Sequence, residues 1–490
     1  MTSARLRLSL PWLLPALVTM LAAAARLWNV GHPATLAFDE TYYVKDAWSL
    51  WQWGYEGKWG ENANELFAQG DTSALGTDGS FVVHPPLGKW LIALGMALLG
   101  PGSSVGWRLA TAILGAATVL LVYFITRELT QSVAFATVAG LLLAVDGLGI
   151  VMSRIALLDT IVTFFIVLAF LFVLYDRRQN GEHPRHEQPP VWGTIVARRP
   201  WIIAAGVALG AATAVKWSGA YALAGIGIYL VVTDALARRR AGVVQWPADA
   251  AFRQGPVTFL LLVPAAVVTY VVSWSGWLLT RGGYDRDSST NPLIALWNYH
   301  RSIYNFHISL SAGHSYASPA WEWPLLLRPT AVWVGGQQDT ECWGSDHCIA
   351  VISTIPNPVT WYLGVAAVLY LMYRVVLGWF EKKPASWTLS VPLVGIAVTY
   401  VPWLLVPDRT IFQFYTVAML PFIVIALTLV LHMIAHAPDA TPARRQAGRA
   451  TVVTIVVIIV LVSLFYYPVW TGMTVPYKFW LLHNWLPGWI

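Results

Sequence analysis

Long apolar runs separated by short loops that carry arginine dominate this sequence and limit what it can fold into. Runs of about 17–25 apolar residues suffice to cross a bilayer as helices. Only 11% of the residues are charged and 57% are hydrophobic, whereas a soluble domain has about 25% charged residues. A soluble protein would lack the polar side chains to cover its surface. We therefore predict an all-α polytopic membrane protein, with residues 1–490 forming one integral membrane domain.

Counting the apolar runs predicts about eleven transmembrane helices. In chain order the runs are 8–30, 108–124, 133–149, 160–175, 201–215, 218–232, 256–279, 359–376, 391–406, 413–433 and 451–467. A cleaved signal peptide is an alternative for the first run, because Ala22–Ala25 resemble a cleavage site. That run, however, continues past the roughly 7–15 residues of a signal core.

The basic residues predict how the chain is oriented. Arg5 and Arg7 precede the first run, and most other arginine clusters fall in loops on the same side. Because such loops stay in the cytoplasm, the N-terminus is predicted to be inside. An odd number of crossings places the tail, residues 468–490, outside, together with a first external loop (31–89) and a large external loop (280–358). This distribution accounts for the +6 net charge and predicts no nucleic-acid partner.

An acidic pair, Asp39 and Glu40, follows the first run almost at once. The two carboxylates should therefore lie just outside the bilayer, where a lipid-linked substrate presents its head group. Adjacent carboxylates need not face the same way. One can accept a proton from an attacking hydroxyl while the other positions the acceptor or a cation. A solvated loop start or a helix cap is the alternative interpretation.

Other ionisable residues are predicted at the same face, and a costly cluster of charges near lipid indicates a site. They are His84, Lys89, Arg108, Arg154, Asp159, Lys216, Arg409 and the histidines of the large loop. The Arg108 guanidinium is well suited to bind a phosphate, with a residue snorkelling at a span end as the alternative. Lys89, Arg409 and Arg154 present the same choice. Asp159 belongs to the site or simply neutralises Arg154.

Three histidines, His300, His307 and His314, are spaced by seven residues. A helix through residues 298–311 would align the first two on one side. Two helical turns rise about 10.5 Å, too far for two imidazoles to share one metal ion. These histidines fit better as hydrogen-bonding groups of an interfacial aromatic helix, with substrate contact as the alternative.

Cys342 and Cys348 are the only cysteines, and both lie in the large external loop. A disulfide between them is favoured in an oxidising compartment, since two thiols fall short of the four ligands of a zinc site. No glycine-rich loop followed by Lys and Ser or Thr indicates a nucleotide donor. The sequence requires no cofactor. A divalent cation stays open, because a carboxylate pair and a phosphate can hold one but basic residues can replace it.

A set of short motifs occurs in order between about residues 38 and 330. They are the Asp39-Glu40 pair, His84-Pro85-Pro86-Leu87-Gly88-Lys89, Arg154-Ile155-Ala156-Leu157-Leu158-Asp159, and His314-Ser315-Tyr316-Ala317-Ser318 leading to Trp323-Pro324-Leu325-Leu326 and Arg328-Pro329. This ordered set resembles the protein O-mannosyltransferases. The large external loop is too short for the extra β-trefoil domain of eukaryotic members, so the chain looks like a bacterial form.

The resemblance implies a C-type glycosyltransferase architecture with external interfacial helices in the first and large loops. It implies transfer of mannose, with inversion, from polyprenyl phosphate mannose to Ser or Thr hydroxyls of exported proteins at the outer face of the cytoplasmic membrane. Asp39 would be the base or orient the acceptor, Glu40 would help to bind the acceptor, and Arg108 would bind phosphate. His84, Arg154, Asp159 and His314 are further candidates. The family's habit of modifying unfolded chains suggests coupling to the secretion translocon.

The chemistry of the donor supports this interpretation. A polyprenyl phosphate is already a good leaving group, so the enzyme need only deprotonate a hydroxyl and stabilise the departing phosphate. One alternative is a related glycosyltransferase that acts on a lipid or a polysaccharide. Another is a secondary transporter, whose ionisable groups should instead lie near the middle of the membrane. A non-catalytic scaffold would need no acidic pair beside basic residues.

Overall fold

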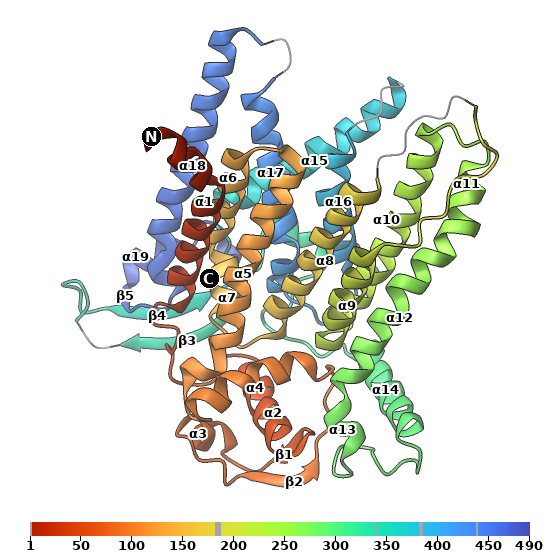
Figure 1. The fold of residues 1–490 in the computed structure, drawn as a ribbon. Helices are drawn as coiled ribbons and strands as arrows, with labels where there is room; N and C mark the ends of the chain where they lie inside the picture. The colour runs from red at the N-terminus through yellow and green to blue at the C-terminus, as the bar shows by residue number, and fades with distance from the viewer. Residues whose placement is uncertain (1, 182–187, 339–340, 382–385, 438–439) are drawn as a thin grey trace.

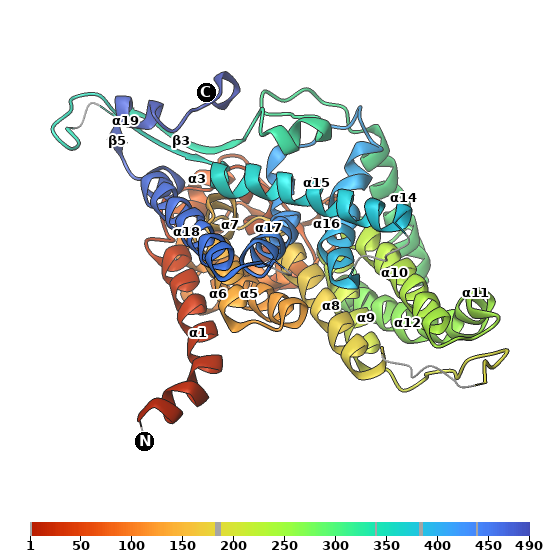
Figure 2. The same cartoon turned by 90° about the horizontal axis from the view of Figure 1, so that it is seen from above.

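The computed structural model describes residues 2–181, 188–338, 341–381, 386–437 and 440–490. Most of the chain is helical, and the long helices lie side by side in one bundle (Figure 1). These helices are α1 (Thr2–Leu27), α5 (Ser104–Thr130), α6 (Val133–Ala144), α8 (Leu158–Asn180), α9 (Pro200–Val215), α10 (Ser218–Arg240), α12 (Gly255–Ser273), α15 (Pro358–Phe380), α16 (Ser390–Leu404), α17 (Leu420–Ala435) and α18 (Pro442–Trp470). Figure 2 shows α1 at one edge of the bundle and α12 at another.

Within the described ranges, seven helices are long and apolar enough to cross a membrane. The pair α6 and α7 (Gly147–Ser153), bent by 59°, would make an eighth span. Residues 12–27 of α1, together with α9 and α17, are shorter apolar helices. The predicted polytopic helical class is therefore confirmed, whereas the count of eleven spans stays a prediction.

The run predicted as one span over residues 133–149 is broken in the structure. The side chain of Asp146 caps α7 by accepting hydrogen bonds from the Leu148 and Gly149 amides, at 2.9 and 3.3 Å. Its second oxygen accepts the Asn357 amide at 3.0 Å. A capping carboxylate inside an apolar run satisfies the amides that a helix start leaves free, so it can begin a new helix there.

The loops of residues 31–89 and 280–358 lie at one end of the bundle, and the arginine-rich loops lie at the other (Figure 1). Five elements fold the first loop: α2 (Glu40–Trp53), β1 (Gly57–Trp59), α3 (Ala63–Ala68), β2 (Leu75–Gly79) and α4 (Leu87–Leu99). The large loop contributes α14 (Pro292–Ser309), the 3-10 helix η2 (Ala320–Leu325), β3 (Ala331–Gln338) and β4 (Cys348–Ser353). The predicted helix through His300 and His307 is present as α14.

Two small antiparallel sheets were not predicted from the sequence. One pairs β1 with β2, and the other has the order β3-β4-β5, with β5 (Val475–Pro476) from the C-terminal tail. The disulfide joins Cys342, in the connection that precedes β4, to Cys348, the first residue of β4. Most of these strands are short, and the pairing of β4 with β5 joins residues far apart in the chain. No local hydrophobic period therefore predicts the two sheets.

Two glycines on α9 allow this helix to pack closely on α12. A Cβ atom at Gly206 would lie 2.3 Å from the Leu262 carbonyl oxygen, and one at Gly210 would lie 2.4 Å from that of Ala266. Small residues four apart let two membrane helices approach backbone to backbone. This contact positions the end of α9, where Lys216 enters the candidate site.

Candidate active site

The acidic pair lies where the chain turns into α2. Phe38 adopts a left-handed backbone conformation, with φ at 51°, which is strained for a residue with a large side chain. Its ring packs edge-on against Phe412 and Phe414, with centroid distances of 5.7 and 5.6 Å. This aromatic packing holds the turn. The carboxylates of Asp39 and Glu40 consequently enter different surroundings.

Glu40 is fully buried and paired with Arg108. The guanidinium donates to both carboxylate oxygens, at 2.7 Å each. The amides of Ala37 and Ala156 donate to the same carboxylate, each at 2.8 Å. With no exposed surface, Glu40 has no route to an acceptor in this conformation, and its geometry is that of an anchor for the loop that carries Asp39.

Arg108 uses its remaining donors on the backbone before α2. It donates to the carbonyl oxygens of Val30, Pro33 and Thr35 at 3.1, 2.8 and 3.1 Å. An arginine has five N–H groups, and here all five are committed to Glu40 and these carbonyls. The prediction of Arg108 as a phosphate ligand therefore finds no support in the geometry, because a buried guanidinium without a free donor cannot reach a substrate.

Asp39 has the surroundings of a base. Among the described residues its side chain makes no hydrogen bond, not even as the N-cap of α2. Burial raises the pKa of Asp39 to about 6, while nearby Lys216 lowers this pKa and Asp159 raises it. At neutral pH the carboxylate is still mostly ionised, and its basicity is closer to that needed for accepting a proton at this pH.

Lys216 follows α9 and lies near enough to Asp39 for its positive charge to lower the pKa of that carboxyl. Its ammonium donates to Asp159 at 2.9 Å and lies 4.2 Å from the ring centroid of Tyr415. Both members of the ion pair are largely buried. The cation is thus held in place at the break between α9 and α10.

Arg154 does not pair with Asp159, so that alternative from the sequence is wrong. Its guanidinium donates to carbonyl oxygens at the end of α1, those of Arg26 and Asn29 at 3.1 and 3.0 Å and that of Trp28. Cations near a helix C-terminus complement its unsatisfied carbonyls. Arg154 is 4% exposed and acts here as a cap of α1.

A cavity of about 950 Å³ lies beside these groups, between α10, α12, α14 and α16. Its wall carries basic, histidine and aromatic side chains. They include His84, Lys216, Trp217, Tyr270, His300, Tyr304, His307, Trp403 and Arg409. At its rim, Ile308 and Leu405 are 67% and 76% exposed. The cavity therefore combines cations, which suit a phosphate, with an apolar edge, which suits a lipid chain.

Arg409 is aimed into this cavity by His307. The guanidinium donates to the His307 carbonyl oxygen at 3.0 Å and lies 3.1 Å from Nδ1 of its ring. Because Nε2 lies 3.0 Å from the carbonyl oxygen of Val83, which can only accept, Nε2 carries the proton and Nδ1 is the acceptor. Burial and Arg409 lower the pKa of His307 to about 4, so the ring is neutral. Within the described residues Nε of Arg409 has no partner.

Lys89 is an anchor, and not a cavity residue. It is 1% exposed, forms an ion pair with Glu56, and donates to the His84 carbonyl oxygen at 3.1 Å. His84 itself lines the cavity, with its ring 5.7 Å from that of His307. Burial, followed by nearby Lys216, lowers the pKa of His84 well below its usual value. The predicted role of Lys89 in binding phosphate has no geometric support.

His314 lies next to the acidic loop but outside the cavity. It is exposed, its Nδ1 accepts the Tyr316 amide at 3.1 Å, and its ring packs edge-on against Phe412 at 5.0 Å. In the part of the chain that the structure describes, no three His, Cys, Asp or Glu side chains gather closely enough to hold a metal ion.

Comparison with protein families decides the relationship. Residues 77–280 match the family described as dolichyl-phosphate-mannose-protein mannosyltransferase, and residues 293–489 match the C-terminal four-transmembrane region of protein O-mannosyltransferase. This chain belongs to the dolichyl-phosphate-mannose-protein mannosyltransferase family. The resemblance seen in the sequence motifs is thereby confirmed.

Relatives of this mannosyltransferase family member extend over almost its whole length. A polyprenol-phosphate-mannose–protein mannosyltransferase of Mycolicibacterium smegmatis is 33% identical, covering 98% of this chain and 93% of the relative. One of Mycobacterium tuberculosis is 34% identical, covering 98% and 92%. The Saccharomyces cerevisiae Pmt1-Pmt2 complex bound to the sugar donor matches in fold, with a TM-score of 0.76 at 16% identity over 98% of this chain and 92% of that one. The expected C-type glycosyltransferase fold is therefore confirmed.

From the sequence, Lys216 was predicted only as one of several charged residues at this face. Its signal was a lysine at the short break between two apolar runs, where a charge is costly unless it has a partner. The partnership of His307 with Arg409 had no such signal, because about a hundred residues separate them in the chain. The seven-residue spacing of His300 and His307 did indicate that they share a helix side, and both line the cavity.

Proposed function

We propose that this chain transfers mannose from polyprenyl phosphate mannose to Ser or Thr hydroxyls of exported proteins, with inversion at the anomeric carbon. The observation that carries the proposal is an ionisable carboxylate without a hydrogen bond, that of Asp39, near Lys216. Lys216 in turn lines a cavity that also presents Arg409. The names of the mycobacterial relatives support the donor and the protein acceptor.

In this mechanism Asp39 acts as the general base. The acceptor oxygen attacks the anomeric carbon, its proton passes to the Asp39 carboxylate, and the bond from the anomeric carbon to the phosphate oxygen breaks. Lys216 and Arg409 stabilise the charge that develops on the departing polyprenyl phosphate. Glu40 and Arg108 hold the loop of Asp39 in place and touch no reacting atom.

We further propose the setting of this reaction. The chain is a multi-pass protein of the cytoplasmic membrane with its N-terminus inside. The tail (residues 468–490), both external loops (31–89 and 280–358) and the active site lie on the outer face. There the enzyme would meet polypeptides as they leave the secretion translocon. The common location of these loops at one end of the bundle supports this arrangement (Figure 1).

Transfer of labelled mannose tests the proposal directly. Purified full-length protein is incubated with polyprenyl phosphate mannose and a Ser/Thr-rich peptide, beside the variants Asp39→Asn and Asp78→Asn. We expect transfer by the wild type and by Asp78→Asn, whose aspartate is exposed on the first loop. Asp39→Asn should lose at least about a thousandfold in rate, because the reaction lacks its base.

The same assay separates the alternatives. Transfer to a lipid or glycan but never to the peptide would overturn the protein acceptor and keep the glycosyltransferase. Full activity in Asp39→Asn would overturn the assignment of the base. The anomeric configuration of the product, read by nuclear magnetic resonance, tests inversion.

A further inference from the structure

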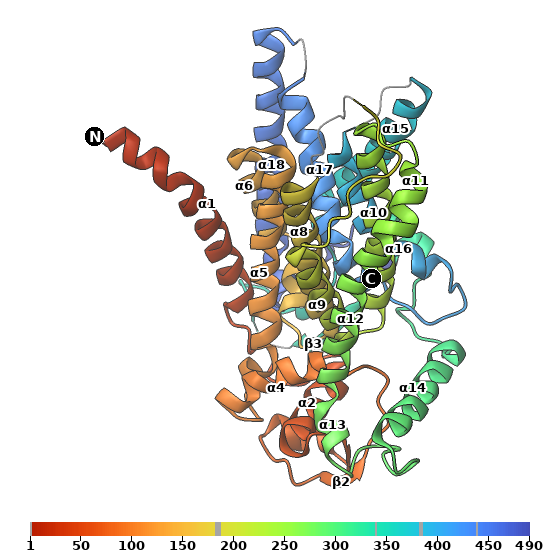
Figure 3. The same ribbon diagram turned by 45° about the vertical axis from the view of Figure 1, so that its right-hand side comes forward.

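The structure has a second groove, at the opposite end of the bundle from Asp39. The proposed mechanism involves none of the residues that line it. It has a volume of about 670 Å³ and lies between α1 and the ends of α5, α8 and α9. Trp12, Phe124, Tyr175 and Trp201 form its aromatic part. Figure 3 shows α1 leaning away from α5 toward its N-terminus, on the side where Trp12 is 75% exposed. The groove is thus accessible from the side of the bundle.

Arginines surround this groove at the last turns of two helices. Arg127 lies in the last turn of α5, and Arg178 lies in the last turn of α8. An adjoining hollow of about 220 Å³ shares Arg178 and Glu128 with the groove and adds Arg177, which lies 4.0 Å over the Trp387 ring. Three arginines therefore face one acidic residue, and the groove region is positively charged.

The single carboxylate neutralises little of this charge. Glu128 accepts a hydrogen bond from Arg178 at 3.1 Å, but Arg178 is 73% exposed, and exposed ion pairs are weak. Among the described residues the Arg127 side chain forms no hydrogen bond or ion pair, although it is half-buried. An anion could thus gain two guanidinium contacts here without breaking a buried interaction.

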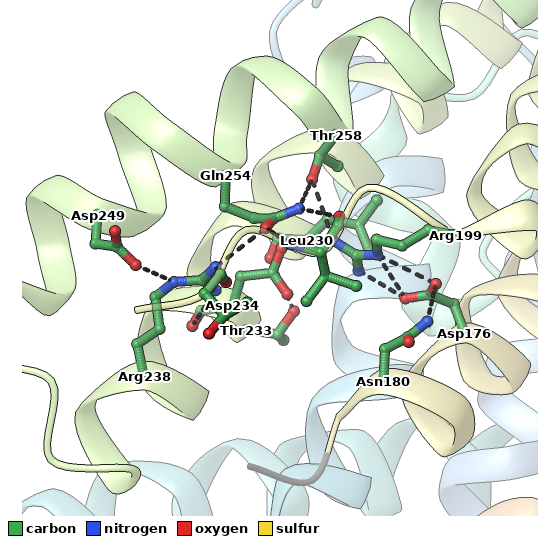
Figure 4. A network of polar contacts seen from close by, with 12 residues as sticks. Asp176, Asn180, Arg199, Leu230, Thr233, Asp234, Arg238, Asp249, Gln254 and Thr258 are labelled. Carbon is green, nitrogen blue, oxygen red and sulfur yellow. Dashed lines mark hydrogen bonds and ion pairs between the residues drawn. The ribbon is translucent and has the colours of Figure 1, made fainter. Parts of the chain in front are cut away.

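A neighbouring polar network at the same end of the bundle contains arginines whose charge is neutralised by aspartates (Figure 4). Arg199 pairs with Asp176 and Asp234, at 2.6 and 2.8 Å. Arg238 pairs with Asp249 at 2.5 Å. Arg253 also pairs with Asp249, at 2.9 Å. Three arginines thus match three aspartates, and most of these side chains are buried. Unlike them, the arginines of the groove keep donors available toward the surface.

We propose that the groove binds an anionic glycerophospholipid. Its phosphate would accept hydrogen bonds from Arg127 and Arg178, and its acyl chains would lie against the aromatic wall. Basic pockets between membrane helices, bordered by tryptophan, have the chemistry that recognises anionic head groups. A free phosphate would lack the acyl contacts.

Thermal unfolding of the full-length protein in neutral detergent tests this site. Phosphatidylglycerol, phosphatidylcholine and inorganic phosphate are each titrated, and the unfolding midpoint is followed. We expect a saturable rise with phosphatidylglycerol alone. The double variant Arg127→Gln/Arg178→Gln should raise the half-saturating concentration at least tenfold. Glu128→Gln, which frees Arg178 from its partner, should lower that concentration.

The matched control is Arg444→Gln/Arg445→Gln, which removes two exposed arginines from the start of α18 at the same end. It should bind phosphatidylglycerol like the wild type. An equal loss in this control would mean attraction by overall charge, and an equal rise with phosphatidylcholine would mean unspecific lipid binding. Stabilisation by phosphate alone would mean an anion site without a lipid. Each of these results overturns the proposal.

Discussion

Asp39 and Glu40 are neighbours in the chain, but only Glu40 is fully buried and ion paired. The free carboxylate has its pKa raised to about 6 by burial. A general base must be deprotonated, so kcat/KM should fall as the pH drops through about 6.

The variant Asp159→Asn should shift this fall in kcat/KM, the acid limb of the pH profile, to lower pH. The substitution removes a negative charge that raises the pKa of Asp39, and it leaves Lys216 unneutralised. A pH profile of mannosyl transfer measures both. A wild-type limb near pH 4 would contradict the assignment.

The paired carboxylate predicts a different phenotype. Glu40→Gln leaves the buried Arg108 guanidinium without its counter-ion, which should lower the free energy of unfolding by about 3–5 kcal/mol. Asp39→Asn should change stability far less, because Asp39 forms no ion pair. Unfolding in detergent, followed by tryptophan fluorescence, compares the two variants. If Glu40 contacted the acceptor instead, Glu40→Gln would keep wild-type stability and raise the KM for the peptide.

At the scale of elements, α14 supplies the wall that orients Arg409. His307→Leu removes the ring nitrogen that accepts from the guanidinium, and a hydrogen bond to a charged group contributes about 1.5–3 kcal/mol. The KM for polyprenyl phosphate mannose should therefore rise about tenfold or more, with a smaller change in kcat. His307→Asn, which keeps an acceptor, should recover part of the loss. Arg301→Ala on the exposed side of α14 is the control and should behave like the wild type.

The pair α8 and α9 is joined by buried ion pairs at both ends. Asp159 and Lys216 meet at the end with the candidate active site, and Asp176 and Arg199 meet at the opposite end. Close packing of α9 on α12 through Gly210 fixes the same unit. The position of Lys216 therefore depends on helix packing across the membrane as well as on its own ion pair.

At the scale of the whole molecule, the ion pairs of Arg199 lie at the opposite end of α8 and α9 from Lys216 and the candidate active site. Arg199→Met leaves Asp176 and Asp234 buried without their cation. This change should lower the free energy of unfolding by about 3–5 kcal/mol. The acid limb of the pH profile should stay at its wild-type position, because Arg199 lies at the far end of the bundle from Asp39. Thermal unfolding and the transfer assay, run on the same preparation, check both expectations. A shifted limb would show that the ends are coupled.

The sequence alone predicted the polytopic helical class, the family, the two loops at one face and the helix with His300 and His307. Those features depend on the local hydrophobic period and on the order of the motifs, and both are properties of the amino-acid sequence itself. The sequence singled out Arg409, but it did not reveal that Glu40, Arg108 and Lys89 are buried in ion pairs, or that Lys216 lines the cavity. A charged side chain becomes a ligand or an anchor according to which partners the fold brings to it. Those partners are distant in the chain, so only the tertiary structure decided the surroundings of each residue.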